Sequence, residues 1–251
     1  MSVSRPAPNA GSRRFTPIVL LIYDLLVIRF SNPLVWRCPT QKYLRPLFTD
    51  NFSKKHLDIG VGNGYFPTKA LADLGRREGR KPKDQQLTLA DLSEHSLESA
   101  KHRVISQHPE ANVQCVLADA AKQLPAELRN DKFDSASLYL VLHCMPGPTA
   151  SKAEAIRNAK SVLTGNGVLV GSTALGKKWE KTQEGYRVMH DQKLGRLTTF
   201  ALGFYNKRGI FDNYQEDPNV FDKTLREEFE EVETRVIGMM FLFRASKPRK
   251  V

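Results

Sequence analysis

Glycines at alternate positions near residue 60 constrain the fold of this chain more than any other feature. Residues 57–65 read LDIGVGNGY, so Gly60, Gly62 and Gly64 follow a short apolar run, and helix-forming residues come next over 69–74. Glycine tolerates positive φ and lets a ligand reach the backbone without meeting a Cβ atom. Although a glycine turn also closes ordinary loops, this order predicts a strand, a tight turn and a helix whose N-terminus faces a ligand.

Acidic residues end the next two apolar runs. Residues 87–92 read LTLADL, and Asp91 lies 27 residues after Gly64. A carboxylate at the end of the adjacent strand can accept hydrogen bonds from both ribose hydroxyls of a nucleoside. Residues 113–120 read VQCVLADA, and Asp119 in that run can accept from the exocyclic amine of adenine. Together the three strand ends predict a nucleoside site at one edge of a parallel sheet.

The motifs LDIGVGNGY, LADLS and LADAA resemble those of the class I S-adenosylmethionine-dependent methyltransferases, closely over residues 55–172 and more loosely over the whole chain. The resemblance implies a Rossmann-like α/β fold, with a mostly parallel seven-stranded sheet, a C-terminal antiparallel hairpin and a helical lid. It also implies S-adenosyl-L-methionine as cofactor and S-adenosyl-L-homocysteine as product. A nicotinamide-dependent oxidoreductase fits less well, because its G-x-G-x-x-G fingerprint places the third glycine one residue later than Gly64.

The same resemblance assigns the cofactor contacts. Asp58 is expected to orient the glycine turn. Tyr23, in a Tyr23-Asp24…Asn32 pattern similar to that of quinone-type methyltransferases, is expected to close over the methionine end. The full set of expected cofactor-binding residues is Tyr23, Asp58, Gly60, Gly62, Gly64, Asp91, Leu92, Asp119, Ala120 and Leu140.

Apolar residues at helical spacing over 15–30 predict an amphipathic helix, which suits a packing helix, a membrane-surface helix or the lid that the resemblance implies. We expect residues 1–12 to be a disordered tail and residues 13–251 a single domain. Its lid spans 13–50, and a cap is inserted over 177–210.

Four residues of the lid and cap are candidates for contact with the acceptor of the methyl group. Trp36 and Arg37 lie at a bend, where they can bind a carboxylate or pack and pair within the fold. Tyr186 and His190 lie in the cap, and for them too simple packing is an open alternative.

His143 is the candidate catalytic residue. It follows the fourth predicted strand, at the end that faces the transferred methyl group in the related fold. An imidazole can take a proton from a phenol or enol oxygen at neutral pH. A structural histidine bound to a loop carbonyl is the open alternative, and His190 is the second candidate base. An already acidic hydroxyl needs little more than proximity, so a base is not required.

The predicted function is methyl transfer to a small, apolar or aromatic molecule of natural-product biosynthesis, with oxygen as the expected acceptor atom. No Asn-Pro-Pro-Tyr-type tetrapeptide follows the fourth strand, which argues against nucleic-acid and protein amide N-methyltransferases. The alternatives are a cyclase or pericyclase of the same fold that binds the cofactor without methyl transfer, and a nucleic-acid methyltransferase. The acceptor, the methylated atom and the oligomeric state stay open.

Charge and composition bound the partners. A net charge of +11 suggests nucleic acid or an anionic surface. However, the basic residues fall into separate runs at 76–83, 177–181 and the C-terminus, without the alternating aromatic residues of a stacking surface. Nucleic acid is therefore not the expected partner.

Cysteine usage and hydropathy suggest the compartment. Cys38, Cys115 and Cys144 are far apart and form no CxxC pair, so we expect no metal site and a reducing compartment. No run reaches the roughly 18 apolar residues of a membrane span, and the polar residues 1–12 do not resemble a signal peptide. A cytoplasmic protein is expected.

Overall fold

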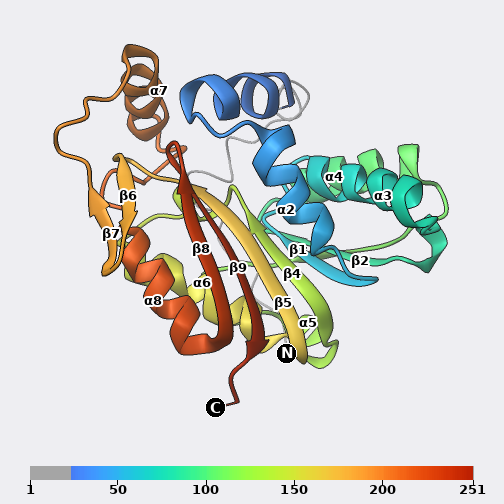
Figure 1. Cartoon of the computed structure of the whole chain (residues 1–251). Coiled ribbons are helices and arrows are strands. Elements are labelled where there is room, and N and C mark those ends of the chain that lie inside the picture. Colours follow the sequence, from blue (N-terminus) through green and yellow to red (C-terminus); the bar gives the residue numbers. More distant parts are fainter. Residues whose placement is uncertain (1–23, 251) are drawn as a thin grey trace.

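The computed structural model describes residues 24–250, which form a seven-stranded sheet with helices on both faces (Figure 1). The strand order is β3-β2-β1-β4-β5-β9-β8. The first five strands are parallel, and β9 is antiparallel to both β5 and β8. This confirms the predicted parallel sheet with an antiparallel C-terminal hairpin. The strands are β1 (Lys55–Ile59), β2 (Gln86–Asp91), β3 (Asn112–Leu117), β4 (Phe133–Tyr139), β5 (Leu163–Ala174), β8 (Phe229–Ile237) and β9 (Met240–Pro248).

Helices connect these strands and cover both faces of the sheet, so that the sheet divides the core into two layers. Phe48 and Leu71 belong to the apolar cluster on one face of the sheet, beneath α2, α3 and α4. Ile156 and Phe221 belong to the cluster on the other face, beneath α5, α6 and α8. Because both faces are covered, the central strands are buried almost throughout, including polar side chains such as His56, Asp58 and Ser137. The helices are η2 (Asp24–Val35), η3 (Thr40–Leu44), α2 (Arg45–Asp50), α3 (Tyr65–Glu78), η4 (Pro82–Asp84), α4 (Glu94–Gln107), α5 (Ala126–Asn130), η5 (Leu142–Cys144), α6 (Thr149–Ser161), α7 (Arg196–Lys207) and α8 (Pro218–Glu228).

The register of the central strands decides which side chains meet at the carboxyl edge. Ile59 pairs with Ala90 of β2 and with Leu138 of β4. The residues that follow these three positions therefore leave the sheet side by side. They are the glycine turn, Asp91 and the segment that leads to η5, so a site can form there from three separate parts of the chain.

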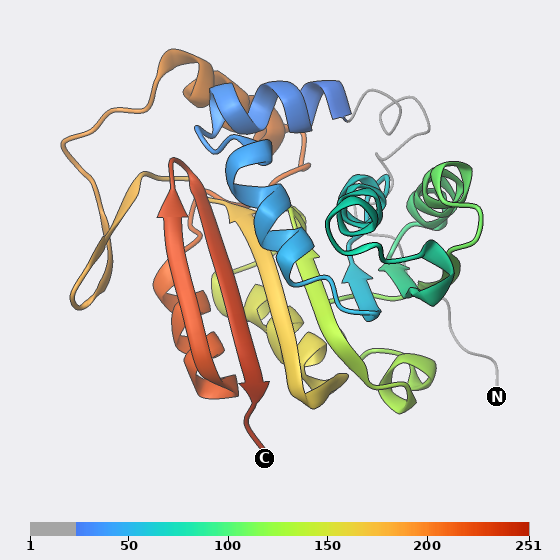
Figure 2. The ribbon, with the colours of Figure 1, turned by 45° about the vertical axis from the view of Figure 1, so that its right-hand side comes forward.

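The predicted cap over 177–210 divides into two parts that lie in different places (Figure 2). A two-stranded sheet of β6 (Trp179–Thr182) and β7 (Gly185–Val188) packs beside α8, where Asn219 Oδ1 accepts a 2.7 Å hydrogen bond from the Tyr186 N–H. α7 instead lies against η2, and Thr198 Oγ1 donates to the Val35 carbonyl at 2.8 Å. α7 therefore contacts the N-terminal helix η2.

The described part of the lid is joined to the C-terminal hairpin. η2 continues to Val35, past the predicted end at residue 30, with Pro33 inside it. Just beyond it, the Trp36 carbonyl accepts a 2.8 Å hydrogen bond from the Met239 N–H. Tyr23 and the predicted tail over 1–12 lie outside the described residues.

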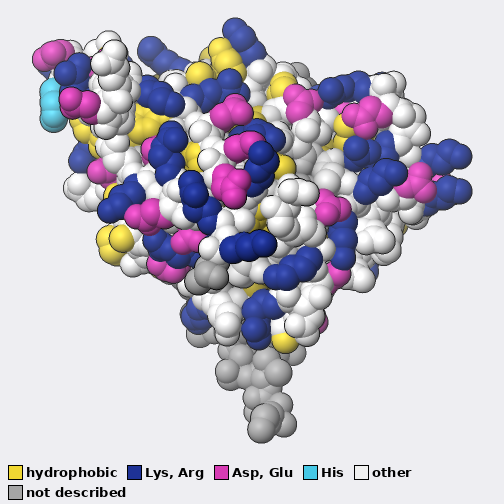
Figure 3. All heavy atoms as spheres, turned by 60° about the horizontal axis from the view of Figure 1, so that its bottom comes forward, with side chains coloured by type: hydrophobic (Ala, Val, Ile, Leu, Met, Phe, Trp, Pro, Cys, Tyr) yellow, Lys and Arg dark blue, Asp and Glu magenta, His cyan; other side chains and the backbone are white. Residues whose placement is uncertain are grey.

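Charges of both signs are mixed on the face shown in Figure 3, where Lys and Arg side chains lie among Asp and Glu. Exposed ion pairs such as Arg157–Glu154, at 2.6 Å, contribute to this mixing. This face therefore offers no continuous basic surface of the kind that nucleic acid binds. Within residues 24–250, no helix is both long and apolar enough to cross a bilayer, and no group of His, Cys, Asp and Glu is arranged to hold a metal ion.

Candidate active site

The glycine turn between β1 and α3 combines a tight contact with an open face. Gly60 has φ +75°, and a Cβ added there would lie 2.6 Å from Val141 Cγ2, so the turn packs directly on the segment after β4. Gly62 has φ +56°, and a Cβ added there would meet nothing within 4 Å. The backbone is therefore open to a ligand at Gly62, as a nucleoside-binding turn requires.

Asp91, the last residue of β2, faces this open turn. Its Oδ2 accepts from the Gly62 N–H at 3.4 Å, and its Oδ1 accepts from the Ser93 N–H at 2.9 Å. Burial raises the pKa of Asp91 to about 6, although these backbone N–H groups oppose the shift. Each carboxylate oxygen retains a free lone pair for a hydroxyl donor, so the geometry suits a ribose diol.

Asp58 lies deeper in the sheet, with only 3% of its surface exposed. It accepts a short hydrogen bond from the Ser137 hydroxyl of β4. Its hydrogen bond therefore runs across the sheet and not to the glycine turn that it was expected to orient. Burial raises the pKa of Asp58 to about 7, the Ser137 bond lowers it, and the nearby Asp91 charge raises it further.

The other expected cofactor residues lie at the same edge. Leu92 follows Asp91 directly. Asp119, just after β3, accepts from the Ala121 N–H at 3.0 Å, while its second oxygen lies 3.6 Å from Lys122 Nζ. Leu140 directly follows β4, has φ +57° and donates its N–H to the Ser172 carbonyl at 2.9 Å. The structure thus brings together Gly60, Gly62, Gly64, Asp91, Leu92, Asp119, Ala120 and Leu140 at the carboxyl ends of β1–β4.

His143 lies in η5, three residues beyond Leu140, and only 4% of its surface is exposed. Its Nδ1 accepts from the Ala174 N–H of β5 at 3.1 Å and lies 3.3 Å from Thr173 Oγ1. Burial, assisted by the positive charge of Lys152, lowers the pKa of His143 to about 3. The ring is therefore neutral at physiological pH.

Three aromatic side chains form a wall beside His143. The Phe211 ring meets the imidazole edge-on, with the ring centroids 4.3 Å apart. Tyr205 stacks on Phe211 at 4.6 Å, and Trp36 packs at 5.9 Å from Phe211. Trp36 thus packs in the aromatic group that contacts His143 through Phe211, whereas its neighbour Arg37 has an exposed side chain and φ +53°.

Two expected acceptor residues are not part of this group. Tyr186 is buried against Phe241, with ring centroids 5.6 Å apart, in the cluster beneath α6 and α8. His190 is exposed in the turn after β7. The physical reason is that the predicted cap divides into two parts. β7 packs beside α8, whereas α7 lies against η2.

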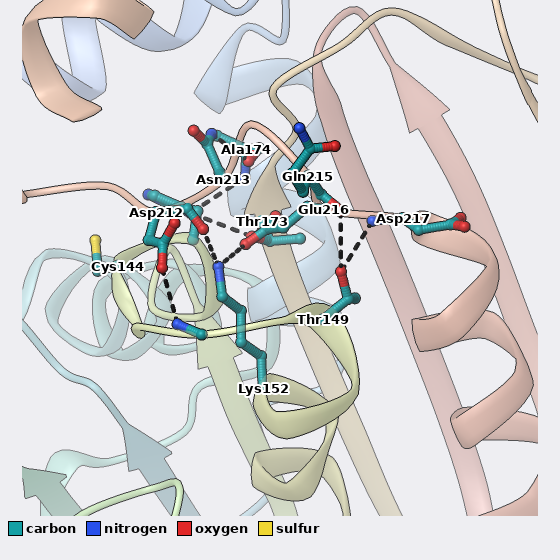
Figure 4. A network of polar contacts seen from close by, with 12 residues as sticks. Cys144, Thr149, Lys152, Thr173, Ala174, Asp212, Asn213, Gln215, Glu216 and Asp217 are labelled. Atoms are coloured by element: carbon teal, nitrogen blue, oxygen red, sulfur yellow. Dashed lines mark hydrogen bonds and ion pairs between the residues drawn. The ribbon is translucent and has the colours of Figure 1, made fainter. Parts of the chain in front are cut away.

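The sequence did not predict a buried ion pair between Lys152 and Glu216, which Figure 4 shows. The pair lies close to the backbone and strand end that contact His143. Lys152 Nζ lies 2.7 Å from Glu216 Oε1, and both side chains are almost fully buried. Lys152 Nζ also donates to the Asp212 carbonyl, and the Asp212 N–H donates to the His143 carbonyl at 2.9 Å. Thr173 Oγ1 donates to Glu216 Oε2 at 3.3 Å. The pair therefore fixes the loop that carries Phe211 and the strand end that contacts the imidazole.

Comparison with known proteins agrees with this geometry. A model of the methyltransferase domain matches residues 57–169. The O-methyltransferase NEC2 of Pyricularia oryzae is 36% identical, over 94% of this chain and 92% of that protein. The chain belongs to the class I S-adenosylmethionine-dependent methyltransferases.

Other relatives of this methyltransferase agree with the assignment. The physcion biosynthesis cluster O-methyltransferase of Aspergillus chevalieri is 38% identical, over 95% of this chain and 96% of that protein. The solved complex of DhpI with SAH shares the fold at a TM-score of 0.59 and 12% identity, over 96% of this chain and 97% of that one. The methyltransferase uses S-adenosyl-L-methionine as cofactor and forms S-adenosyl-L-homocysteine.

Proposed function

We propose that this methyltransferase methylates an oxygen atom of a small, apolar or aromatic metabolite. The observation that supports this most is the wall of Trp36, Tyr205 and Phe211 beside His143, on the segment that follows β4. Aromatic walls of this kind bind flat apolar molecules. The relatives named O-methyltransferases, one of them from a physcion biosynthesis cluster, support oxygen as the acceptor atom and natural-product biosynthesis as the context.

The protein's own residues hold the cofactor in this proposal. Asp91 binds the ribose hydroxyls, Asp119 the adenine amine, and the open backbone at Gly62 lets the cofactor approach. Asp58 stays in the sheet, where it accepts from the Ser137 hydroxyl. When bound, S-adenosyl-L-methionine supplies an electrophilic methyl group, so the protein must position the acceptor and exclude water.

The domain boundaries and the location of the protein are parts of the same proposal. Residues 13–251 form one domain, in which the lid over 13–50 and α7 from the cap cover the acceptor. Tyr23 closes over the methionine end. The protein works in the cytoplasm, which suits cysteines that form no disulfide within the described chain.

Calorimetry with S-adenosyl-L-homocysteine and with NADH tests the cofactor assignment. Asp91→Asn keeps the shape of the side chain but removes its charge. We expect it to weaken binding of the homocysteine compound about 10- to 100-fold, because a hydrogen bond to a charged group contributes about 1.5–3 kcal/mol. The matched control is Asp134→Asn, an exposed acid near the amino end of β4. Equal affinities in both variants would remove Asp91 from the site.

A screen of phenols, hydroxyquinones and amines with labelled cofactor tests the acceptor class. We expect S-adenosyl-L-homocysteine and an O-methylated product with aromatic hydroxyl compounds. Tight cofactor binding with no methylated product in any class would instead favour a protein that binds the cofactor for another reaction.

A further inference from the structure

The hydrogen bonds around His143 determine which ring nitrogen carries the proton. The Ala174 N–H is part of the backbone of β5 and points at Nδ1 from 3.1 Å. A backbone N–H can only donate, so Nδ1 must be the unprotonated acceptor. The Thr173 hydroxyl, 3.3 Å from Nδ1, donates its proton to Glu216 and leaves Nδ1 to the Ala174 N–H. In the neutral imidazole the proton therefore lies on Nε2.

The second nitrogen, Nε2, is available for a ligand. None of residues 24–250 gives it a hydrogen-bond partner, and it is not among the described polar atoms that are both sealed from solvent and unpaired. The imidazole ring packs edge-on against Phe211, so the aromatic wall adjoins the ring that carries Nε2. A donor without a partner at this position needs an acceptor atom from outside the described chain.

We propose that His143 binds the acceptor as a hydrogen-bond donor, through Nε2–H to the oxygen that receives the methyl group, and not as its general base. The inference rests on the proposed function, since it assigns a role within that site. As a base, His143 would have to free a nitrogen lone pair toward the acceptor. This would break the Ala174 bond or leave a backbone N–H facing an N–H group.

The Lys152–Glu216 pair keeps the imidazole in place. Through the Asp212 carbonyl and N–H it anchors the backbone of His143, and through Thr173 it anchors the strand end beside Nδ1. Of the charged groups around this segment, Lys152 on α6 acts on the His143 ring, whereas Glu216 before α8 and Asp91 on β2 act on the neighbouring Cys144 thiol. The cation of Lys152 opposes a second proton on the ring.

A donor at this position selects a class of acceptor. It favours an oxygen that arrives as an anion, such as an acidic phenol or enol ionised at neutral pH. The C–O bond then forms as the C–S bond of the sulfonium breaks, the anionic and cationic charges cancel, and no proton has to be removed during the step. A hydroxyl that stays protonated would need a base that His143 does not supply.

Nitrogen NMR of the imidazole rings tests the protonation state without any acceptor. The full chain is labelled with 15N-histidine, and spectra of wild type and His143→Gln, each with S-adenosyl-L-homocysteine, assign the His143 ring by difference. We expect a neutral ring with its proton on Nε2 that does not titrate from pH 8 to pH 5. A proton on Nδ1, or titration within this range, would overturn the proposal.

Two substitutions separate a donor from a base. The Nε2 amide of His143→Gln can donate but cannot accept a proton at neutral pH, whereas His143→Leu can do neither. With 4-nitrophenol as an ionised acceptor, we expect His143→Gln to keep kcat/KM within about 10-fold of wild type and His143→Leu to lose about 10- to 100-fold more. The wild-type and His143→Gln pH profiles should follow the same ionisation, that of the acceptor.

Controls distinguish failure of the donor role of His143 from failure of the proposed acceptor class. Both variants should bind S-adenosyl-L-homocysteine as wild type does and should keep its melting temperature within a few degrees. If His143→Gln is as inactive as His143→Leu while it folds and binds normally, the donor role is wrong. If no phenol is methylated by wild type, the proposed acceptor class fails, and the NMR spectra still decide the protonation state of His143.

Discussion

Replacing the glycines of the turn by alanine, one at a time, tests the distinction between packing and cofactor contact. Gly60 and Gly62 both have positive φ, but only at Gly60 would a Cβ collide, 2.6 Å from Val141 Cγ2. Left-handed backbone costs a residue with a Cβ about 1–2 kcal/mol. Overpacking of the kind expected against Val141 costs about 1–3 kcal/mol more. Gly60→Ala should therefore destabilise the fold by about 2–5 kcal/mol, whereas Gly62→Ala should cost only the backbone strain of about 1–2 kcal/mol.

Thermal unfolding and cofactor affinity are measured together for both variants. In a chain of this size, 1 kcal/mol shifts the melting temperature by about 2–4 °C, so Gly60→Ala should melt roughly 5–15 °C lower than wild type. Gly62→Ala should melt within a few degrees of wild type but bind S-adenosyl-L-homocysteine at least about 10-fold more weakly, because its methyl group enters the open space at the turn.

A compensating substitution provides the control. Val141→Ala removes the methyl groups that a Cβ at residue 60 would meet. The double variant Gly60→Ala/Val141→Ala should therefore be more stable than the sum of the two single effects predicts. The reasoning is refuted if Gly60→Ala and Gly62→Ala lower stability equally and affinity equally, or if Val141→Ala gives no compensation.

Three further predictions follow from buried and exposed charges. Lys152→Met should lower the free energy of unfolding by about 3–5 kcal/mol, measured with denaturant, because it leaves the Glu216 carboxylate buried without its cation. The double variant with Glu216→Gln should recover part of this loss. An equal loss in the single and double variants would contradict the pairing. Burial lowers the pKa of His56 to about 3, so the unfolded state takes up a proton below pH 6.5 before the folded state does. From pH 6.5 to pH 5 this residue should reduce stability by about 2 kcal/mol. Unfolding curves at several pH values should lose this contribution in His56→Gln and keep the similar one of buried His143, whose pKa is also lowered to about 3. His190→Ala should leave kcat and KM within about 2-fold of wild type in a methylation assay, since the side chain is exposed away from His143; a larger change would return it to the site.

The cofactor half of the site was predictable because its residues belong to local patterns. Gly62, Asp91 and Asp119 each end or follow an apolar run, and parallel strands bring such ends to one edge whatever the rest of the chain does. The mostly parallel seven-stranded sheet with its antiparallel C-terminal hairpin came from the resemblance and was confirmed.

The acceptor half could not be predicted to the same extent, because it depends on contacts between distant segments. Phe211 reaches His143 from a turn 68 residues further along the chain, and the turn is held by Lys152 and Glu216. The sequence pattern around Glu216 does not predict a buried carboxylate. Tyr186 was expected in the acceptor site because it is aromatic and lies in the cap, but residue type does not decide which face of the sheet an insertion packs on. The alternation of WEKT and GYRV over 179–188 was a readable hairpin signal.

The join between the N-terminal helices and the tip of the C-terminal hairpin has a consequence for engineering this enzyme. The Met239 N–H binds the Trp36 carbonyl, and a Cβ at Gly238 would lie 2.3 Å from the same oxygen. The N-terminal helices, which we propose cover the acceptor, are therefore fitted to a turn some 200 residues away in sequence. A chimera that grafts the first 50 residues of a relative should fold and keep its activity only when the donor's hairpin tip is transferred with them. The proposed lid thus depends on two separate pieces of sequence.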